Sequence, residues 1–158
     1  NRAPILVLVL DNETTAMTGF QPHPGTGVTA TNEKSKKISI EDIAKAVGVD
    51  YVEVFDPYDV KKAVEAIEKG LRVVLNGGVA VLIARRMCSL LAFRLGLVKT
   101  RYTIDEALCR GCMVCVKALA CPAIVVEEGR KPRIYGELCR GCGVCAQICP
   151  YQAIVEKS

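Results

Sequence analysis

Cysteine is the residue type with the most chemistry to offer in this chain, and eight of its nine cysteines fall into two copies of one pattern. The first copy, C-R-G-C-M-V-C, spans residues 109–115 and is followed by Cys121-Pro122. The second, C-R-G-C-G-V-C, spans residues 139–145 and is followed by Cys149-Pro150. Three thiolates at i, i+3 and i+6 can bind three corners of a [4Fe-4S] cubane. The spacing therefore indicates iron–sulfur chemistry.

The cysteine before each proline is expected to serve the other copy's cluster. A short helix after the third cysteine carries this residue away from its own loop, as the spacing of bacterial two-cluster ferredoxins requires. The first cluster would then be held by Cys109, Cys112, Cys115 and Cys149. The second would be held by Cys139, Cys142, Cys145 and Cys121.

Paired cysteines also occur in structural zinc sites and in disulfide frameworks, and both alternatives stay open. Zinc takes four ligands and needs neither a third cysteine at i+6 nor a repeated Cys-Pro step. The pattern therefore favours clusters over zinc. Because cluster ligands must remain reduced thiolates, we expect the protein to be cytoplasmic.

Length and composition are those of a globular protein. The 158 residues, 51% of them hydrophobic, can form one core or two small domains. The formal charge of +4 comes from scattered lysines and arginines with few aromatics among them, so we expect no nucleic-acid partner. Two clusters with their thiolates carry about −2 each and would offset this excess. The apolar run over residues 5–10 is too short to cross a bilayer, so no membrane partner is expected.

The first part of the chain shows alternating strand and helix patterns. Periodicity predicts a strand over 4–10, a helix over 40–47, a strand over 51–55, a helix over 57–74 and a strand over 79–84. Ser39 and Asp56 are the expected N-caps. The strands at 4–10 and 79–84 are continuously apolar, which is typical of strands buried on both faces of a parallel sheet. The order strand–helix–strand–helix–strand predicts such a sheet with right-handed crossovers.

The cysteine-rich part begins near Tyr102, after a connecting segment over residues 85–101. Between the two cysteine patterns, residues 123–126 and 133–135 are expected to pair as a hairpin. The predicted fold class is thus an α/β parallel-sheet domain over residues 1–98, followed by an α+β domain of the bacterial 2[4Fe-4S] ferredoxin type over residues 99–158.

A long polar loop runs from Asp11 to Lys37, directly after the first predicted strand. Ligands of open parallel sheets bind beyond the carboxyl ends of the strands, so this loop is where a binding site is expected. Asp11-Asn12-Glu13-Thr14 alone is also an ordinary turn sequence.

The longer string from Asp11 to Gly27, D-N-E-T-T-A-M-T-G-F-Q-P-H-P-G-T-G, closely resembles a thiamine-diphosphate motif. The motif is that of the alpha subunits of indolepyruvate ferredoxin oxidoreductases, within the 2-oxoacid:ferredoxin oxidoreductase family. Ala84-Arg85-Arg86 before Cys88 and the tandem cluster patterns are similar to that family as well. The resemblance covers essentially the whole chain. It implies that residues 1–98 are the C-terminal part of a thiamine-diphosphate-binding domain, and that the Gly-Asp half of the motif lies upstream in a larger protein.

The resemblance also implies a cofactor site in this loop. Asn12 would bind Mg²⁺ through its side-chain oxygen and Thr14 through its carbonyl oxygen, with the ion bridging to the cofactor diphosphate. Gly19 would be a further cofactor-binding residue. Oxygen ligands shared with phosphates suit Mg²⁺.

The activity implied by the resemblance is oxidative decarboxylation of a 2-oxoacid, an arylpyruvate and above all indolepyruvate, to an acyl-CoA. Electrons would pass through the two [4Fe-4S] clusters to ferredoxin. The implied partners are a smaller subunit of the oxidoreductase, ferredoxin, coenzyme A and the 2-oxoacid substrate. The alternative is a non-catalytic ferredoxin-like electron-transfer module, which the cluster pattern alone would support.

Two further residues have open roles. Cys88 belongs to neither cysteine pattern, and we expect a buried, structural thiol rather than a reactive one activated by Arg85 and Arg86. His23, the one histidine of the chain, could contact substrate or cofactor, but a solvated loop residue is the favoured interpretation.

Overall fold

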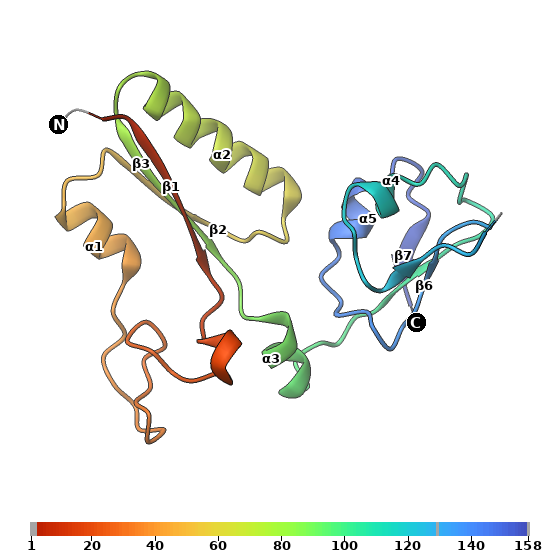
Figure 1. The fold of residues 1–158 in the computed structure, drawn as a ribbon, viewed down its shortest axis with the longest axis horizontal. Coiled ribbons are helices and arrows are strands. Elements are labelled where there is room, and N and C mark those ends of the chain that lie inside the picture. Colours follow the sequence, from red (N-terminus) through yellow and green to blue (C-terminus); the bar gives the residue numbers. More distant parts are fainter. Residues whose placement is uncertain (1–2, 129, 158) are drawn as a thin grey trace. The chain divides into compact units, whose positions relative to one another are not determined.

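The computed structural model describes residues 3–128 and 130–157. The chain separates into two compact units, Asn1–Leu91 and Ala92–Ser158, each of which is described by itself (Figure 1). The domain limits inferred from the sequence, 1–98 and 99–158, remain a prediction.

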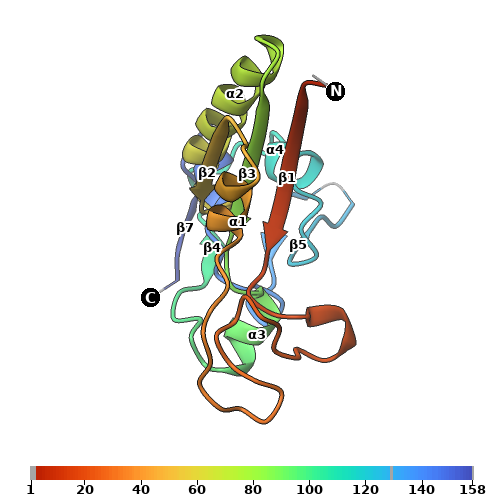
Figure 2. The ribbon, with the colours of Figure 1, turned by 90° about the vertical axis from the view of Figure 1, so that its left-hand side faces the viewer.

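The first unit is a three-stranded parallel sheet with one helix on each face (Figures 1 and 2). Its strands are β1 (Ile5–Asp11), β2 (Tyr51–Phe55) and β3 (Val79–Arg85), in the order β1-β3-β2. Helices α1 (Ile40–Ala46) and α2 (Val60–Leu75) form the crossovers. The predicted parallel sheet is therefore confirmed.

The core lies on both sides of the central strand β3. On the α2 side, Leu82 and Ala84 pack with Phe55 and Ala66. On the α1 side, Val81 and Ile83 pack with Ala44. Leu82 and Ile83 are completely buried, as the continuous apolar run over residues 79–84 predicts.

The prediction that the first strand is buried on both faces is wrong for the described residues. Strand β1 lies at the sheet edge and pairs with β3 alone, and none of its residues is buried. Leu10 is 76% exposed and Leu8 is 48% exposed. A continuous apolar run indicates a strand without polar alternation, but burial depends on neighbours that the local pattern does not reveal.

Helix α1 begins as predicted, with the Ser39 hydroxyl accepting a hydrogen bond from the Asp42 backbone N–H at 3.0 Å. The predicted start of α2 at Asp56-Pro57 is wrong. Its N-cap is Asp59, whose carboxylate accepts from Lys62 N–H at 3.1 Å. The Asp56 carboxylate instead accepts from Tyr58 N–H at 2.9 Å and closes a turn before the helix, because Asp stabilises turns and caps equally well.

The second unit holds two short antiparallel pairs and two short helices. Strand β4 (Tyr102–Ile104) pairs with β7 (Ile154–Glu156), and β5 (Ile124–Val125) pairs with β6 (Arg133–Ile134). The predicted hairpin is thus confirmed. Helices α4 (Val114–Lys117) and α5 (Val144–Ile148) pack with buried Ile124 and Ile154 around the cysteines.

Four short elements fall in segments for which no element was predicted, and two of them are the paired strands β4 and β7 of the second unit. Helix α3 (Ser89–Arg94) lies within the connecting segment, and the 3-10 helix η1 (Ala16–Thr18) lies within the polar loop. None of the helices in the described ranges 3–128 and 130–157 is both long and apolar enough to span a membrane.

Candidate cluster and cofactor sites

The two cysteine loops have matching local structures. We call residues 109–115 the first cluster loop and residues 139–145 the second cluster loop. In each loop a residue with left-handed backbone, Met113 or Gly143, is the N-cap of a short helix. The third cysteine of each loop, Cys115 or Cys145, is therefore in the first turn of that helix and is buried. The repeat in the sequence is thus a repeat in the backbone.

The fourth cysteine of the first set comes from the second repeat. One pocket of the second unit is lined by Cys109, Cys112, Cys115 and Cys149. Burial raises the pKa of the Cys115 thiol, and the charges of the three other cysteines of this set add to the rise. The structure therefore brings Cys149 to the first cluster loop, as the crossover assignment expects.

The second set shows the reciprocal arrangement. Burial raises the pKa of the Cys145 thiol to about 11. The neighbouring charges that add to this rise belong to Cys142, Cys121 and Cys139. Cys121, from the first repeat, thus lies near the second cluster loop. The structure shows that the cysteines of each set lie near one another. Binding of a cluster by each set stays a prediction.

The donor chemistry of both sets fits [4Fe-4S] clusters. Each set offers four thiols, which become strong ligands once iron displaces their protons. Within the described ranges, no three His, Cys, Asp or Glu side chains converge on a site for a single metal ion. A single zinc ion would require sulfurs at about 2.3 Å from one centre.

The polar loop leaves β1 through two successive side-chain turns. The Asp11 carboxylate accepts from Glu13 N–H at 3.1 Å, and the Asn12 side-chain oxygen accepts from Thr14 N–H at 3.2 Å. Cys88 N–H donates to the Asn12 carbonyl at 2.9 Å. The loop is therefore tied to the segment after β3 at the residue expected to bind Mg²⁺. Thr14 is buried, with 6% of its surface exposed. The hydrogen bond from Thr14 N–H to Asn12 holds the two expected ligands in one short turn.

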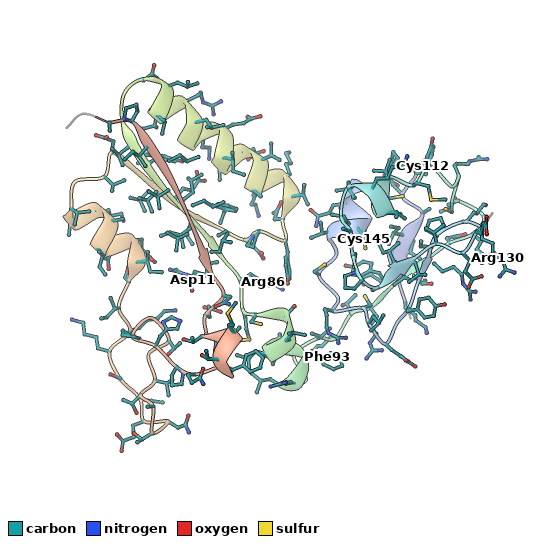
Figure 3. The ribbon with its side chains drawn as sticks, in the orientation of Figure 1. Asp11, Arg86, Phe93, Cys112, Arg130 and Cys145 are labelled. Carbon is teal, nitrogen blue, oxygen red and sulfur yellow. The ribbon has the colours of Figure 1, made fainter. Side chains whose placement is uncertain are left out.

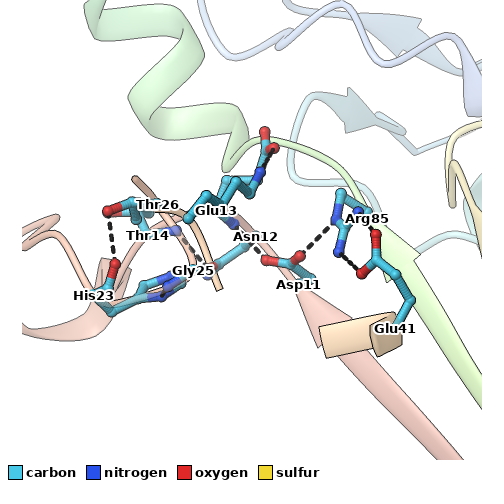
Figure 4. A network of polar contacts seen from close by, with 10 residues as sticks. Asp11, Asn12, Glu13, Thr14, His23, Gly25, Thr26, Glu41 and Arg85 are labelled. Carbon is cyan, nitrogen blue, oxygen red and sulfur yellow. Dashed lines mark hydrogen bonds and ion pairs between the residues drawn. The ribbon is translucent and has the colours of Figure 1, made fainter. Parts of the chain in front are cut away.

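Arg85 connects this turn to helix α1 (Figure 4). Its Nε donates to the Asp11 carboxylate at 2.7 Å, and its two Nη atoms donate to Glu41 at 3.0 and 2.8 Å. The hydrogen bond from Arg85 lowers the pKa of Glu41 to about 2. Burial opposes ionisation of Asp11, but hydrogen bonds from Arg85 and the Glu13 amide outweigh it, and the pKa of Asp11 is lowered.

This network is a feature that sequence reasoning missed, although a signal was available. Asp11 and Arg85 end neighbouring parallel strands, where they are register partners. Opposite charges at the carboxyl ends of adjacent parallel strands lie close enough to pair. Glu41 has no such signal, because its position depends on how α1 packs on the sheet.

Gly19, His23 and Cys88 keep open roles. Gly19 has φ 117° and ends η1 with its N–H donating to the Ala16 carbonyl at 3.3 Å. His23 Nδ1 accepts from Gly25 N–H at 3.1 Å, so one ring nitrogen is engaged within the loop (Figure 4). Cys88 is half-buried, and its backbone rather than its thiol makes the contact with Asn12.

Comparison with protein families agrees with both units. Residues 1–84 match the thiamine pyrophosphate enzyme C-terminal TPP binding domain, TPP being thiamine diphosphate. Residues 106–126 and 132–155 each match a 4Fe-4S binding domain. The comparison with solved structures gave no match.

Curated relatives resemble nearly the whole chain. A protein of Thermococcus kodakarensis named indolepyruvate oxidoreductase subunit IorA is 45% identical over 97% of this chain and 24% of its own length. The protein of that name from Archaeoglobus fulgidus is 46% identical over 98% of this chain and 24% of its own length. The chain thus spans about a quarter of the length of these relatives. With the family match covering the parallel-sheet unit, the chain belongs to the thiamine pyrophosphate enzymes and carries a ferredoxin-type 4Fe-4S part after their C-terminal cofactor-binding domain.

Proposed function

We propose that this chain is part of a thiamine-diphosphate-dependent 2-oxoacid:ferredoxin oxidoreductase, in which it holds the metal end of the cofactor and two [4Fe-4S] clusters. The observation that carries the proposal is the joint presence of a TPP-binding domain and two sets of four cysteines in one chain. A thiamine site yields electrons in pairs, whereas clusters accept them singly, so an enzyme that oxidises through thiamine needs such a relay.

The proposed reaction takes a 2-oxoacid, coenzyme A and two oxidised ferredoxins. It releases the acyl-CoA, carbon dioxide, one proton and two ferredoxins that have each gained one electron. The name of the relatives supports indolepyruvate and related arylpyruvates as substrates. When bound, thiamine diphosphate supplies the carbanion chemistry of the decarboxylation.

The chain's own residues hold these groups. Asn12 would offer its side-chain oxygen and Thr14 its carbonyl oxygen to Mg²⁺, which would supply positive charge for the cofactor diphosphate. The Asn12 oxygen already accepts from Thr14 N–H, and its second lone pair is the one proposed for the ion. The assigned cysteine sets hold the two clusters as thiolates. Gly19 shapes the loop beside the diphosphate.

Partners follow from the same proposal. The relatives are each named as a subunit, which supports a smaller partner subunit in the complete enzyme. Ferredoxin accepts the electrons. Because the cluster thiolates must stay reduced, the enzyme works in the cytoplasm.

Purified complete enzyme, incubated anaerobically with indolepyruvate, coenzyme A and oxidised ferredoxin, tests the function. Ferredoxin reduction that requires all three, and that stops when thiamine diphosphate and Mg²⁺ are removed, is the expected result. A protein that exchanges electrons with ferredoxin but never responds to any 2-oxoacid would instead be an electron-transfer module.

A further inference from the structure

The two cluster loops have nearly the same sequence but differ in how far they are covered. Three side chains of the first cluster loop are exposed, whereas their counterparts in the second are half-buried. The exposed residues are Arg110, Cys112 and Val114, and the counterparts are Arg140, Cys142 and Val144. Figure 3 labels Cys112, the exposed cysteine of the first cluster loop. The repeat therefore builds two similar loops in unequal surroundings.

The cover of the second cluster loop comes from residues 93–102, which we call the cover segment. The guanidinium of Arg140 lies 4.2 Å from the centre of the Phe93 ring, a cation–π contact. Arg101 donates to the Gly136 carbonyl at 2.9 Å, just before the loop. Tyr102 belongs to β4 and is held against β7 by the ladder between the two strands. These contacts fasten the segment at both of its ends.

The equivalent glycines of the two loops show how closely the cover segment approaches the second cluster loop. A Cβ atom on Gly141 would overlap the Thr100 carbonyl oxygen and lie 2.9 Å from Val98 Cγ1. A Cβ atom on the equivalent Gly111 would meet only Lys131 Cγ, at 3.9 Å. The two glycines have φ 66° and 65°, so their backbones are alike and only their surroundings differ.

The single residue type that differs within the two cluster loops follows the same asymmetry. Position 113 is Met, and the equivalent position 143 is Gly. A Cβ atom on Gly143 would lie 2.8 Å from the Tyr102 hydroxyl, so a side chain there would require the Tyr102 ring to shift. Met113 has a similar left-handed backbone, φ 61°, and its side chain is accommodated at the open first loop.

We propose that the first cluster loop is the place where the soluble ferredoxin docks and takes electrons, and that the cover segment insulates the second cluster loop from solvent and from that partner. This assignment rests on the proposed function. Electron transfer between proteins falls steeply with distance, so an external carrier exchanges electrons where a cluster loop is exposed. Solvent exposure is also one of the factors that set cluster potential, so the cover segment makes the two clusters electronically unequal.

The electrons balance at this surface. Each contact oxidises the cluster held at the first loop by one electron and reduces one ferredoxin by one electron. Two contacts remove the electrons released from one 2-oxoacid. No other oxidant is required.

Solvent access to each cluster is the direct test. Complete enzyme bearing Cys112→Ser or Cys142→Ser is reduced with dithionite, and the microwave power saturation of its EPR signal is recorded with and without a dysprosium–EDTA complex. In Cys142→Ser the intact first cluster should relax strongly with dysprosium, whereas the intact second cluster of Cys112→Ser should respond weakly. A serine-ligated cluster that persists is recognised by its altered spectrum. Equal responses, or a stronger response from the second cluster, would overturn the proposal.

Gly141→Ala and Gly111→Ala form a matched pair, because both add a methyl group at the same left-handed backbone and only one meets the cover segment. Gly141→Ala should raise the dysprosium response of the second cluster and speed hydrogen exchange of the amides at residues 98–102. Gly111→Ala should leave both unchanged. Unchanged exchange in Gly141→Ala would show that no cover segment shields the loop.

Docking is tested with two exposed apolar residues. Val114 is 38% exposed on the first repeat, and Leu138 is 48% exposed beside the second cluster loop. Val114→Glu should raise KM for ferredoxin by a larger factor than it changes the rate with methyl viologen, whereas Leu138→Glu should change the ferredoxin and methyl viologen reactions by the same factor. A larger ferredoxin effect from Leu138→Glu would place the docking site on the second repeat.

The readouts separate this inference from the proposed function. Dysprosium access and hydrogen exchange need no substrate. An enzyme with unequal cluster access but no 2-oxoacid turnover would refute the function alone. Turnover with equal cluster access would refute the docking assignment alone.

Discussion

Arg85 binds carboxylates from two different elements at the start of the polar loop. Its side chain is 22% exposed, and the Asp11 side chain is 8% exposed. Arginine's planar fork matches a carboxylate such as Glu41 with two parallel hydrogen bonds, which lysine cannot do. The same guanidinium also orients Asp11, the residue directly before Asn12. Arg85 therefore positions the turn, and the carboxylates of Asp11 and Glu41 are its partners.

Replacing Arg85 with Gln should destabilise the chain by about 2 kcal/mol, because Asp11 is left largely buried without its charge partner. Arg85→Lys should recover only part of the loss. Denaturant midpoints at pH 7 measure both variants. Because the folded pKa of Glu41 is depressed to about 2 from 4.5, the part of the stability due to Glu41 is fully present above pH 4.5 and is lost as the pH falls toward 2. A full recovery in Arg85→Lys would show that charge alone, without the fork, holds the turn.

Asn12→Ala in the complete enzyme should weaken the binding of Mg²⁺ and of thiamine diphosphate together, because it removes the proposed side-chain ligand of the ion. Calorimetric titration of thiamine diphosphate at several Mg²⁺ concentrations measures this linkage. Asn12→Asp keeps an oxygen in place both for the ion and for Thr14 N–H, so it should bind nearly as the unaltered enzyme does. If Asn12→Ala leaves both affinities unchanged, Asn12 is only a turn residue.

Cys88→Ala should keep both clusters and most of the 2-oxoacid-dependent ferredoxin reduction. The contact with the polar loop is the hydrogen bond from the backbone N–H of Cys88 to the Asn12 carbonyl, and alanine retains this N–H. Iron content and turnover are measured on the same preparation. Loss of turnover with iron content intact would place the Cys88 thiol in the mechanism.

At the scale of elements, α2 shows why a glycine can lie inside a long helix. Gly70 is buried where the helix crosses the sheet, and a Cβ atom there would lie 2.9 Å from Leu6 Cδ1 and 3.0 Å from Leu82 Cδ1. Glycine weakens a helix by about 1 kcal/mol relative to alanine, so local propensity disfavours a glycine inside this helix. The helix instead runs unbroken to Leu75, because close packing on β3 outweighs the local preference.

Gly70→Ala should therefore destabilise the protein by roughly 1 to 2 kcal/mol despite its better helix propensity, since Leu82 is completely buried and has little room to move. Gly70→Val should cost more. Thermal or denaturant unfolding followed by circular dichroism gives the comparison, with exposed Glu68→Ala as the control. A gain in stability for Gly70→Ala would mean that the leucine side chains shift freely.

At the scale of the whole molecule, charge and cysteine content balance each other. The formal charge is +4 without metal. Two [4Fe-4S] clusters with their thiolates bring about −2 each, so the assembled chain is close to neutral. Eight of the nine cysteines belong to the two cluster sets, which leaves Cys88 outside both.

Anaerobically reconstituted protein should contain about eight irons and eight acid-labile sulfides per chain, as two cubanes require. Iron and sulfide assays with parallel zinc analysis provide the measurement. Removing the iron should destabilise the second unit in particular, because cysteines form much of its core around Ile124 and Ile154. Stoichiometric zinc without sulfide would instead support the structural zinc alternative.

The sequence alone determined the chemistry of the cysteines, the parallel strand–helix alternation and the position of the polar loop. These features are local: three cysteines within seven residues reach one cluster, and an apolar run or a helical period is formed by neighbours in the chain. The N-cap at Ser39 and the hairpin of β5 and β6 were predictable for the same reason. Asp56 was a less certain signal, because Asp stabilises both turns and caps.

Only the tertiary structure decided which residues from distant segments meet. Glu41 and Arg85 are 44 residues apart, and their pairing depends on how α1 packs beside the end of β3. The exposure of β1 depends on its place at the sheet edge, and the unequal cover of two nearly identical cluster loops depends on where residues 93–102 pass. Local sequence patterns specify backbone conformation and ligand chemistry. Burial and long-range pairing depend on how the elements pack against one another, which local patterns do not specify.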